Sequence, residues 1–237
     1  GATRARFAPR PRGRRRRRKP FLAELPLILT VAVVLSLLLK TFVMQAFYIP
    51  STSMQPTLEI GDRVFVSKLS TRFGEVHRGD VVVFRDPGGW LPDVAEPPAG
   101  GPVRTAVRDA LVFLGLAPSA TGDDLIKRVI GVGGDRVRCC DARGRVTVNG
   151  TALDEPYILG GDAPSEVDFD VRVPRGSVWV MGDHRAVSED SRFHRDDPRA
   201  GMVPVDDVIG RAFVVVWPAH RWTGLGRPET FEGVGGP

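Results

Sequence analysis

Residues 124–149 read DLIKRVIGVGGDRVRCCDARGRVTVN, which combines strand-like runs with a turn-like segment. Apolar residues dominate 125–130, and polar and apolar residues alternate over 136–140, as is typical of strands. Residues 141–144 (Asp-Ala-Arg-Gly) have the composition of a turn, and 145–149 supply a return strand, so a hairpin is expected. The stretch therefore predicts short strands joined by tight turns.

The same patterns continue on both sides of this stretch. Val103 to Leu116 has the spacing of a helix with one apolar side, for which packing on the protein surface is favoured over lying on a membrane. The Pro- and Gly-rich residues 86–102 predict a long loop. One such helix among many short strands predicts a mainly β domain, a barrel-like structure or a sandwich. The further strands are expected at 62–68, 80–84, 171–173, 177–181 and 211–217.

Charge is distributed unevenly along the chain. The 237 residues carry a formal net charge of +5 at pH 7, yet residues 1–20 hold ten of the 33 basic residues and no acidic residue. Residues 21–237 therefore keep 23 basic against 28 acidic residues, a net charge of −5. A mildly acidic body argues against binding of nucleic acid. The high content of Arg, Gly and Pro indicates a high-GC bacterium, with an actinobacterium as the first candidate.

An apolar run follows the basic tail directly. No residue from Leu25 to Leu39 is charged, and residues 21–43 match the ~20 residues that cross a bilayer. Because the basic residues precede the run, the positive-inside rule predicts a cytoplasmic N-terminus and an extracytoplasmic body. A cleavable signal peptide has the same layout, but residues 40–46 contain only a poor cleavage site. We therefore expect a single-pass anchor in the plasma membrane.

Neither the cysteines nor the histidines form a metal-binding pattern. Cys139 and Cys140 are adjacent, so they provide no CxxC spacing. Neighbours in a strand point to opposite faces, so a disulfide between them would require strain, and their role stays open. The four histidines are scattered and match no HExxH sequence. We expect no metal and no other cofactor.

Two residues are candidates for nucleophilic chemistry. Ser53 lies in the Ser/Thr/Pro loop 51–57; such loops are usually structural, and a serine needs a nearby base to act as a nucleophile. Lys127 lies inside the apolar strand 125–130, where lysine is rare. The strand alone favours an edge-strand lysine that blocks aggregation. The alternative is a desolvated lysine that is neutral enough to accept a proton.

A third segment completes a pattern. Residues 182–192 read GDHRAVSEDSR and follow the apolar strand 177–181. Together with IPSTSMQPTL at 49–58 and KRVIG at 127–131, in this order after one apolar run, the chain resembles the bacterial type I signal peptidases. The resemblance extends from about Phe21 to Trp217, and its motifs are specific in combination.

The resemblance assigns roles residue by residue. Ser53 corresponds to the nucleophile of the family and Lys127 to its general base. Ser51 corresponds to the hydroxyl that helps form the oxyanion hole, and Ser188 to the residue that orients the lysine amine. Two further sets correspond to walls of the shallow substrate pocket and to structural ion pairs. The pocket set is Ile49, Met54 and Leu58, and the ion-pair set is Asp183, Asp190, Arg192 and Arg128.

The chain departs from the family pattern within the third segment. His184 stands where Asn is usual, and Ala186-Val187 stand where Asp-Asn is usual. These departures remove side chains that hydrogen-bond within the usual turn. Ser188 and the two charged residues that follow it keep the pattern.

The resemblance also implies a function and a domain organisation. The function is a membrane-bound serine endopeptidase that removes N-terminal signal peptides from exported preproteins after small-x-small sites, through an acyl-enzyme. The expected partners are secretory preproteins and membrane lipid, with no nucleic acid. The expected parts are a basic cytoplasmic tail, a transmembrane helix, an extracytoplasmic catalytic β-domain and a small β insertion. Their ranges are 1–20, 21–43, 44–137 with 173–237, and 138–172, respectively.

Two alternatives remain. Another Ser-Lys peptidase, such as a pilus-maturation enzyme or a self-cleaving repressor, would share the chemistry, but a repressor needs a DNA-binding domain and no apolar span. A membrane-tethered binding protein with an inactive site belongs to a different class, and the intact Ser53, Lys127 and Ser188 argue against it. Acylation of Ser53 by a penem-type inhibitor discriminates between an active and an inactive site.

Overall fold

The computed structural model divides the chain into two compact units, residues 1–39 and 40–237. The helix predicted at 103–116 lies outside the described residues, as does most of the predicted loop 86–102. The described residues are 21–69, 74–91, 101 and 124–236.

The first element is helix α1 (Phe21–Phe42). It contains Pro26, whose ring removes one backbone donor, and Thr30 Oγ1 donates a hydrogen bond to the Pro26 carbonyl oxygen at 2.8 Å. The side chains of residues 25–35 are exposed, although most of them are apolar. Within the part of the chain that the structure describes, no helix is both long enough and apolar enough to cross a membrane.

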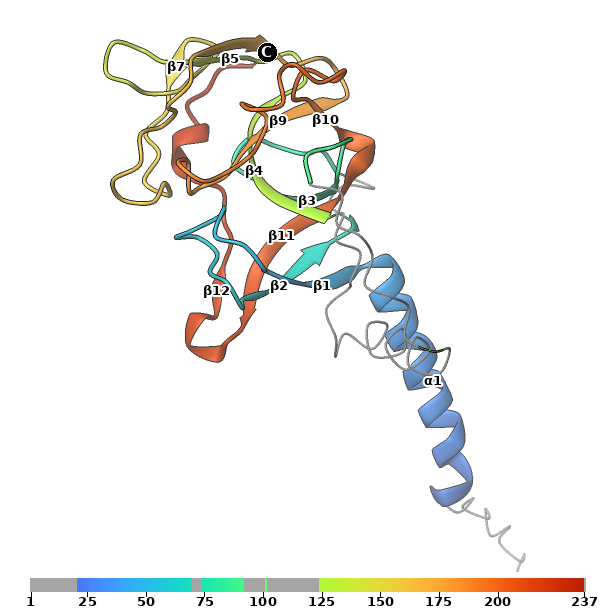
Figure 1. The fold of residues 1–237 in the computed structure, drawn as a ribbon. Helices are drawn as coiled ribbons and strands as arrows, with labels where there is room; N and C mark the ends of the chain where they lie inside the picture. Colours follow the sequence, from blue (N-terminus) through green and yellow to red (C-terminus); the bar gives the residue numbers. More distant parts are fainter. Residues whose placement is uncertain (1–20, 70–73, 92–100, 102–123, 237) are drawn as a thin grey trace, which may run out of the picture. The chain divides into compact units, whose positions relative to one another are not determined.

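Residues 40–237 contain the larger of two antiparallel sheets (Figure 1). Eight described strands form it, in the spatial order β1-β2-β11-β3-β4-β9-β10, with β12 pairing with β11. The predicted mainly β class is thereby confirmed, whereas barrel-like closure stays a prediction because the described pairing runs from β1 to β10. The strands are β1 (Met44–Tyr48), β2 (Arg63–Ser67), β3 (Val81–Arg85), β4 (Asp124–Val132), β9 (Ser177–Met181), β10 (Val203–Pro204), β11 (Val208–Trp217) and β12 (Thr223–Gly224).

The smaller sheet contains four described strands in the order β7-β6-β5-β8. The predicted hairpin is present in it, since Val137 pairs with Val148, but the return strand is shorter than 145–149. The sheet begins before residue 138, and the predicted domain boundaries stay a prediction. Its strands are β5 (Arg136–Cys139), β6 (Thr147–Val148), β7 (Thr151–Ala152) and β8 (Phe169–Arg172).

Both faces of the larger sheet are covered, as β3 demonstrates. Val81 and Val83 belong to one buried cluster, and Val82 and Phe84 belong to another. A strand buried on both faces requires a continuous apolar run, which β3 supplies. The next strand, β4, pairs with β3 on one side and with β9 on the other. Lys127 therefore does not lie on an edge strand, and the aggregation-blocking explanation for this lysine is wrong.

The C-terminal segment connects the two sheets. After β12 the chain reaches the smaller sheet, where Asp154 N donates to Thr230 Oγ1 at 2.9 Å, and Phe231 joins the buried cluster of that sheet. Arg78 donates to the Val234 carbonyl oxygen at 3.1 Å. The sheets are therefore fastened by more than the β4–β5 connection. Three short 3-10 helices occur among the described residues after β10, namely η1 (Val205–Asp207), η2 (Ala219–Arg221) and η3 (Glu229–Phe231).

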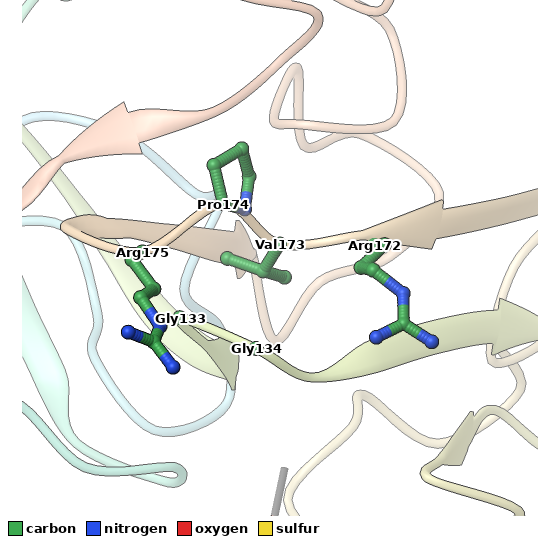
Figure 2. Close-up of a pocket in the computed structure, with 6 residues that line it drawn as sticks. All are labelled: Gly133, Gly134, Arg172, Val173, Pro174 and Arg175. Atoms are coloured by element: carbon green, nitrogen blue, oxygen red, sulfur yellow. The ribbon is translucent and has the colours of Figure 1, made fainter.

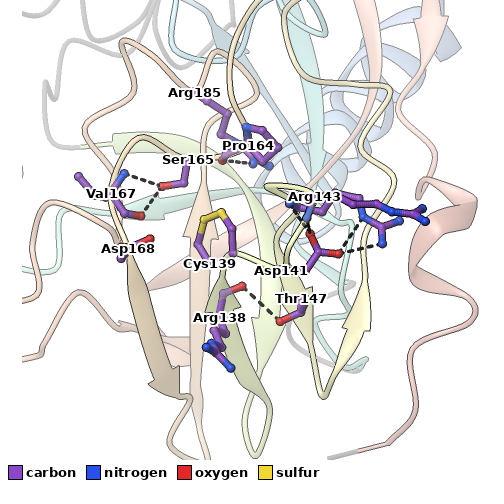
Figure 3. The surroundings of a disulfide bond; sticks show 12 residues. Arg138, Cys139, Asp141, Arg143, Thr147, Pro164, Ser165, Val167, Asp168 and Arg185 are labelled. Atoms are coloured by element: carbon purple, nitrogen blue, oxygen red, sulfur yellow. Dashed lines mark hydrogen bonds and ion pairs between the residues drawn. A yellow bond between two sulfur atoms is a disulfide. The ribbon is translucent and has the colours of Figure 1, made fainter.

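Cys139 and Cys140 form a disulfide (Figure 3). Strand β5 ends at Cys139, so Cys140 does not continue it, and the expectation that the two side chains point to opposite faces of a strand is wrong. Cys139 belongs to the same buried cluster as Val137 and Phe169, and Cys140 packs against that cluster. The disulfide is therefore part of the core of the smaller sheet.

Candidate active site

The structure brings Ser53 and Lys127 together. Lys127 lies on β4, and its Nζ donates a hydrogen bond to Ser53 Oγ at 2.7 Å. Both residues are buried, with 8% of Ser53 and 4% of Lys127 exposed. Ser53 lies in the turn after β1, and its carbonyl oxygen accepts a hydrogen bond from His184 N at 3.1 Å. Strand β4 and the segment around His184, both distant from Ser53 in the sequence, therefore contact the turn that carries the Ser53 hydroxyl.

The environment of Lys127 increases the fraction of its amine that is neutral near physiological pH. Burial lowers its pKa from 10.5 to about 8, because desolvation destabilises the charged amine. The carboxylates of Asp190, Asp183 and Glu189 raise this pKa. The guanidinium of Arg192 lowers it. The net effect is an amine that is about half neutral near pH 8 and can then accept a proton from a serine hydroxyl.

Ser51 and Ser188 occupy different positions relative to this pair. Ser51 is exposed, and its Oγ lies 3.3 Å from Ser53 Oγ. Ser188 is buried, and its Oγ has no hydrogen-bond partner among the described residues. The predicted contact of Ser188 with the lysine amine is therefore not made in this structure. Its predicted role in orienting Lys127 stays a prediction.

Asp183 and Arg128 form a buried ion pair beside Lys127. Arg128 Nε and one terminal nitrogen donate to the two carboxylate oxygens of Asp183 at 2.8 and 2.6 Å. Thr57 Oγ1 donates to the same carboxylate at 2.5 Å. Arg128 also donates to the carbonyl oxygen of Gly79 at 2.9 Å. This pair fastens the strand of Lys127 to the loop of Ser53 and to the segment 182–192.

Asp190 and Arg192 form a second pair within that segment. Arg192 donates to both oxygens of Asp190 at 2.8 and 2.9 Å, and both residues are fully or almost fully buried. Asp190 also accepts from Gly182 N at 2.9 Å. A Cβ at Gly182 would overlap Ser188 Oγ and the carbonyl oxygen of Ser53. Only a glycine therefore allows the turn of Ser53 and Ser188 to approach each other this closely.

The residues predicted to line the substrate pocket are core residues. Ile49, Met54 and Leu58 are 1%, 0% and 0% exposed and belong to the buried cluster that includes Val81 and Val83. Their role in substrate binding stays a prediction. A surface cavity of about 530 Å³ lies elsewhere and contains none of the predicted site residues. Figure 2 shows its lining, which is Gly133, Gly134, Arg172, Val173, Pro174 and Arg175.

Sequence reasoning missed several contacts of the site. Thr57 was not singled out, although a hydroxyl four positions after a candidate nucleophile was a signal that was available. His184 was noted only as a departure; its Nδ1 lies 3.3 Å from the Thr52 carbonyl oxygen. Glu155 and Tyr157 contact the site from the chain between β7 and β8, where no local pattern marks them. Among the described residues, no group of three His, Cys, Asp or Glu side chains could hold a metal ion.

A buried serine hydroxyl paired with a buried lysine of lowered pKa, on a β scaffold, is the arrangement of hydrolases that use serine and lysine. Comparison with known proteins identifies the family of hydrolases to which the chain belongs. The family model "Signal peptidase, peptidase S26" matches residues 22–217. The chain belongs to this family, and it is therefore an enzyme, a peptidase.

Similar proteins carry the family name. A "Probable signal peptidase I" of Mycobacterium leprae is 38% identical, with 92% of this chain and 83% of the relative covered. A "Signal peptidase I" of Mycobacterium tuberculosis is 42% identical over 85% of this chain and 74% of the relative. These relatives support the predicted actinobacterial origin. A solved signal peptidase I of Enterococcus faecalis is 22% identical, covers 58% of this chain and 96% of its own, and has a TM-score of 0.36.

Proposed function

We propose that the protein is a membrane-bound endopeptidase that removes N-terminal signal peptides from exported preproteins with a Ser53–Lys127 dyad. The observation that carries the proposal is the 2.7 Å hydrogen bond between Lys127 Nζ and Ser53 Oγ in a buried site. Membership in the signal peptidase family supports the substrate class. The lowered pKa of Lys127 supports its role as the base.

The proposed reaction proceeds through an acyl-enzyme. The neutral Lys127 amine accepts the proton of Ser53 as Oγ attacks the scissile carbonyl carbon. Oxyanion donors stabilise the tetrahedral intermediate, and one such donor is worth about 3–4 kcal/mol in other enzymes. Ser51 Oγ, 3.3 Å from the nucleophile, is suited to this role together with the backbone N–H of Ser53. The protonated lysine then protonates the leaving amine, and a water activated by Lys127 hydrolyses the ester.

The structural ion pairs have a supporting role in this proposal. Both pairs are buried: Asp183 with Arg128 fixes the segment 182–192 against β4, and Asp190 with Arg192 braces that segment internally. Breaking one partner of such a pair leaves an uncompensated buried charge, which destabilises a protein by about 3–5 kcal/mol. Ser188 lies in the same segment and is available to hydrogen-bond the lysine amine once Ser53 is acylated.

The substrate enters as a precursor held by its own apolar segment. Ile49, Met54 and Leu58 form the walls of the shallow pockets for small side chains at the positions one and three before the cut. We assign residues 21–43 to a single transmembrane anchor, residues 1–20 to the cytoplasm and the body to the outside. The uncharged run from Leu25 to Leu39 and the basic residues before it support this assignment. The catalytic β-domain then comprises 44–137 and 173–237, with 138–172 as an insertion.

Substitution of the base tests the mechanism. Lys127→Arg should abolish cleavage of a purified preprotein by the detergent-solubilised enzyme, because guanidinium stays protonated and cannot accept a proton from Ser53. Lys68→Arg is the matched control, since it makes the same replacement at a lysine outside the candidate site, and should cleave at the wild-type rate. Circular dichroism checks folding of both variants. Near-normal cleavage by Lys127→Arg would refute the dyad.

A labelling experiment separates this proposal from a binding protein with an inactive site. A penem-type inhibitor should acylate Ser53 in the wild type, and mass spectrometry of peptides should place the adduct on that residue. Ser53→Ala should remain unlabelled. A folded wild type that takes no label and cuts no precursor would favour the binding protein.

A further inference from the structure

The ring of Tyr157 lies beside two arginines, Arg128 of β4 and Arg185 of the segment 182–192. Tyr157 is 9% exposed and belongs to the buried cluster of the smaller sheet, in the chain between β7 and β8. The guanidinium carbon of Arg128 lies 4.3 Å from the centroid of its ring, and that of Arg185 lies 6.0 Å from it. A cation above an aromatic face is attracted by the negative charge of that face. The ring therefore contacts residues of β4 and of the segment 182–192 together.

The hydroxyl of Tyr157 extends this contact to Arg185. It donates a hydrogen bond to Glu155 Oε1 at 2.7 Å. Arg185 donates to both oxygens of Glu155, at 3.1 and 2.6 Å, and to the Gly182 carbonyl oxygen at 2.9 Å. Burial raises the pKa of Tyr157 well above 10.0, so its hydroxyl keeps the proton that it donates. Glu155 and Tyr157 thus hold Arg185 from outside the larger sheet.

The position of Arg128 has an electrostatic consequence for its neighbour Lys127. Four charged groups that act on the lysine amine come from the segment 182–192, and Ser53 contacts the amine from the turn after β1. Asp183 stabilises the protonated amine, and Arg128 neutralises Asp183 through two hydrogen bonds. Displacing Arg128 would therefore leave Asp183 free to favour protonated Lys127. The four groups of the segment 182–192 that shift the pKa of Lys127 are Asp190, Asp183, Arg192 and Glu189.

We propose that Tyr157 is a positioning residue for the peptidase reaction, whose ring and hydroxyl keep Arg128 and Arg185 in the arrangement that a neutral Lys127 requires. The proposal rests on the proposed function of Lys127 as the general base. It assigns a task in the reaction to the chain between β7 and β8, which contains none of the predicted catalytic residues. The smaller sheet then acts as a support for the site.

The test compares variants of Tyr157 in the full-length enzyme over a range of pH. Tyr157→Leu removes the aromatic face, so the acidic limb of the kcat/KM profile should move to higher pH by about one unit, a loss of about tenfold near neutral pH. The loss should appear in kcat with little change in KM. Tyr157→Phe keeps the ring over Arg128 but loses the hydrogen bond of the hydroxyl to Glu155, so its profile should shift in the same direction by less than that of Tyr157→Leu. Tyr157→Met replaces Tyr157→Leu if the latter does not fold.

Phe169→Leu is the matched control. Phe169 is a buried aromatic of the same cluster that packs against Trp179, at 5.4 Å between ring centroids, whereas the cation–π contacts of Arg128 and Arg185 are with Tyr157. This variant should lower the melting temperature and leave the pH profile unchanged. A wild-type profile for folded Tyr157→Leu, or an equal shift for Phe169→Leu, would overturn the proposal. If Lys127→Arg proved active, the proposed function would fail instead, whatever the Tyr157 variants showed.

Discussion

At the scale of single residues, the proposed mechanism makes the reaction depend on the protonation state of Lys127. Its pKa is lowered to about 8 by burial, and a lysine accepts a proton only in the neutral form. The rate of acylation should therefore rise with pH and level off above about 8, the reverse of the behaviour expected for a protonated catalytic group. Measuring kcat/KM with a preprotein between about pH 6 and 10 checks this. A rate independent of pH below 8 would contradict it.

The same shift has a consequence for stability. The pKa of Lys127 is about 8 in the folded protein and 10.5 when the side chain is exposed. Between pH 8 and 10.5 the unfolded chain therefore binds more protons than the folded protein. The contribution of Lys127 to the free energy of unfolding should therefore increase as the pH rises through this window. Lys127→Met should lose this dependence. Urea denaturation at several pH values measures it.

Gly182 is the second residue on which a prediction depends. An added Cβ would overlap Ser188 Oγ and the Ser53 carbonyl oxygen, so Gly182→Ala must move one of these groups. A displacement of about 1 Å in an active site can cost about 10²-fold in rate, so we expect a loss in kcat of roughly that size with a folded protein. Gly226→Ala is the matched control, since nothing lies within 4 Å of its added Cβ. Equal activity of both variants would show that the site tolerates the shift.

At the scale of elements, the sequence predicts long apolar strands well and short ones poorly. The strands β3, β4, β9 and β11 contain apolar runs, and all four were expected; the first three lie within two residues of the expected bounds, whereas β11 begins three residues earlier than expected. Two-residue strands such as β10 and β12 carry no periodicity, because pairing with a neighbour alone defines them. The edge-strand interpretation of Lys127 was wrong because β4 pairs with a strand on each side, β3 and β9. The partners of a strand are not visible in its own sequence.

In the candidate site, too, the sequence predicts residues that belong to a motif but not the contacts between distant segments. Ser53 and Lys127 were predicted because their segments match a family in combination, and the structure places their side chains in contact. Tyr157 was missed because its contact with Arg128 joins two segments that no local pattern connects. Packing between elements creates such contacts, so only the three-dimensional structure reveals them.

The loop that follows β1 should determine substrate specificity. If Ile49, Met54 and Leu58 wall the pockets, Ala, Gly or Ser should be accepted at the positions one and three before the cut, and bulky residues excluded. A single methylene misfit in such a pocket is worth about 1–3 kcal/mol, so larger side chains should block turnover. Cleavage rates of precursors that differ only at these positions measure the preference. A precursor with Phe at the position before the cut that is processed as fast as one with Ala would contradict the assignment.

At the scale of the whole molecule, membrane anchoring of enzyme and substrate would explain the arrangement of the chain. Ser53 follows Lys40 by only 13 positions, so a nucleophile on an anchored chain would stay close to the membrane surface. A precursor held by its own apolar segment would present its cleavage site at the same level. Confinement of both partners to one surface raises their effective concentration without any new contact.

An anchored enzyme could reach exported precursors in only one orientation in the membrane, and the charge of residues 1–20 predicts that orientation. Ten basic residues precede the apolar run and no acidic residue accompanies them, so residues 1–20 should stay in the cytoplasm and the body should lie outside. Protease added to intact spheroplasts should therefore digest the region after about residue 45, because that region would be accessible without lysis. A cytoplasmic protein in the same spheroplasts serves as the control for integrity and should remain undigested. Protection of the body in intact spheroplasts, together with digestion after lysis, would reverse the orientation and separate the Ser53–Lys127 site from exported precursors.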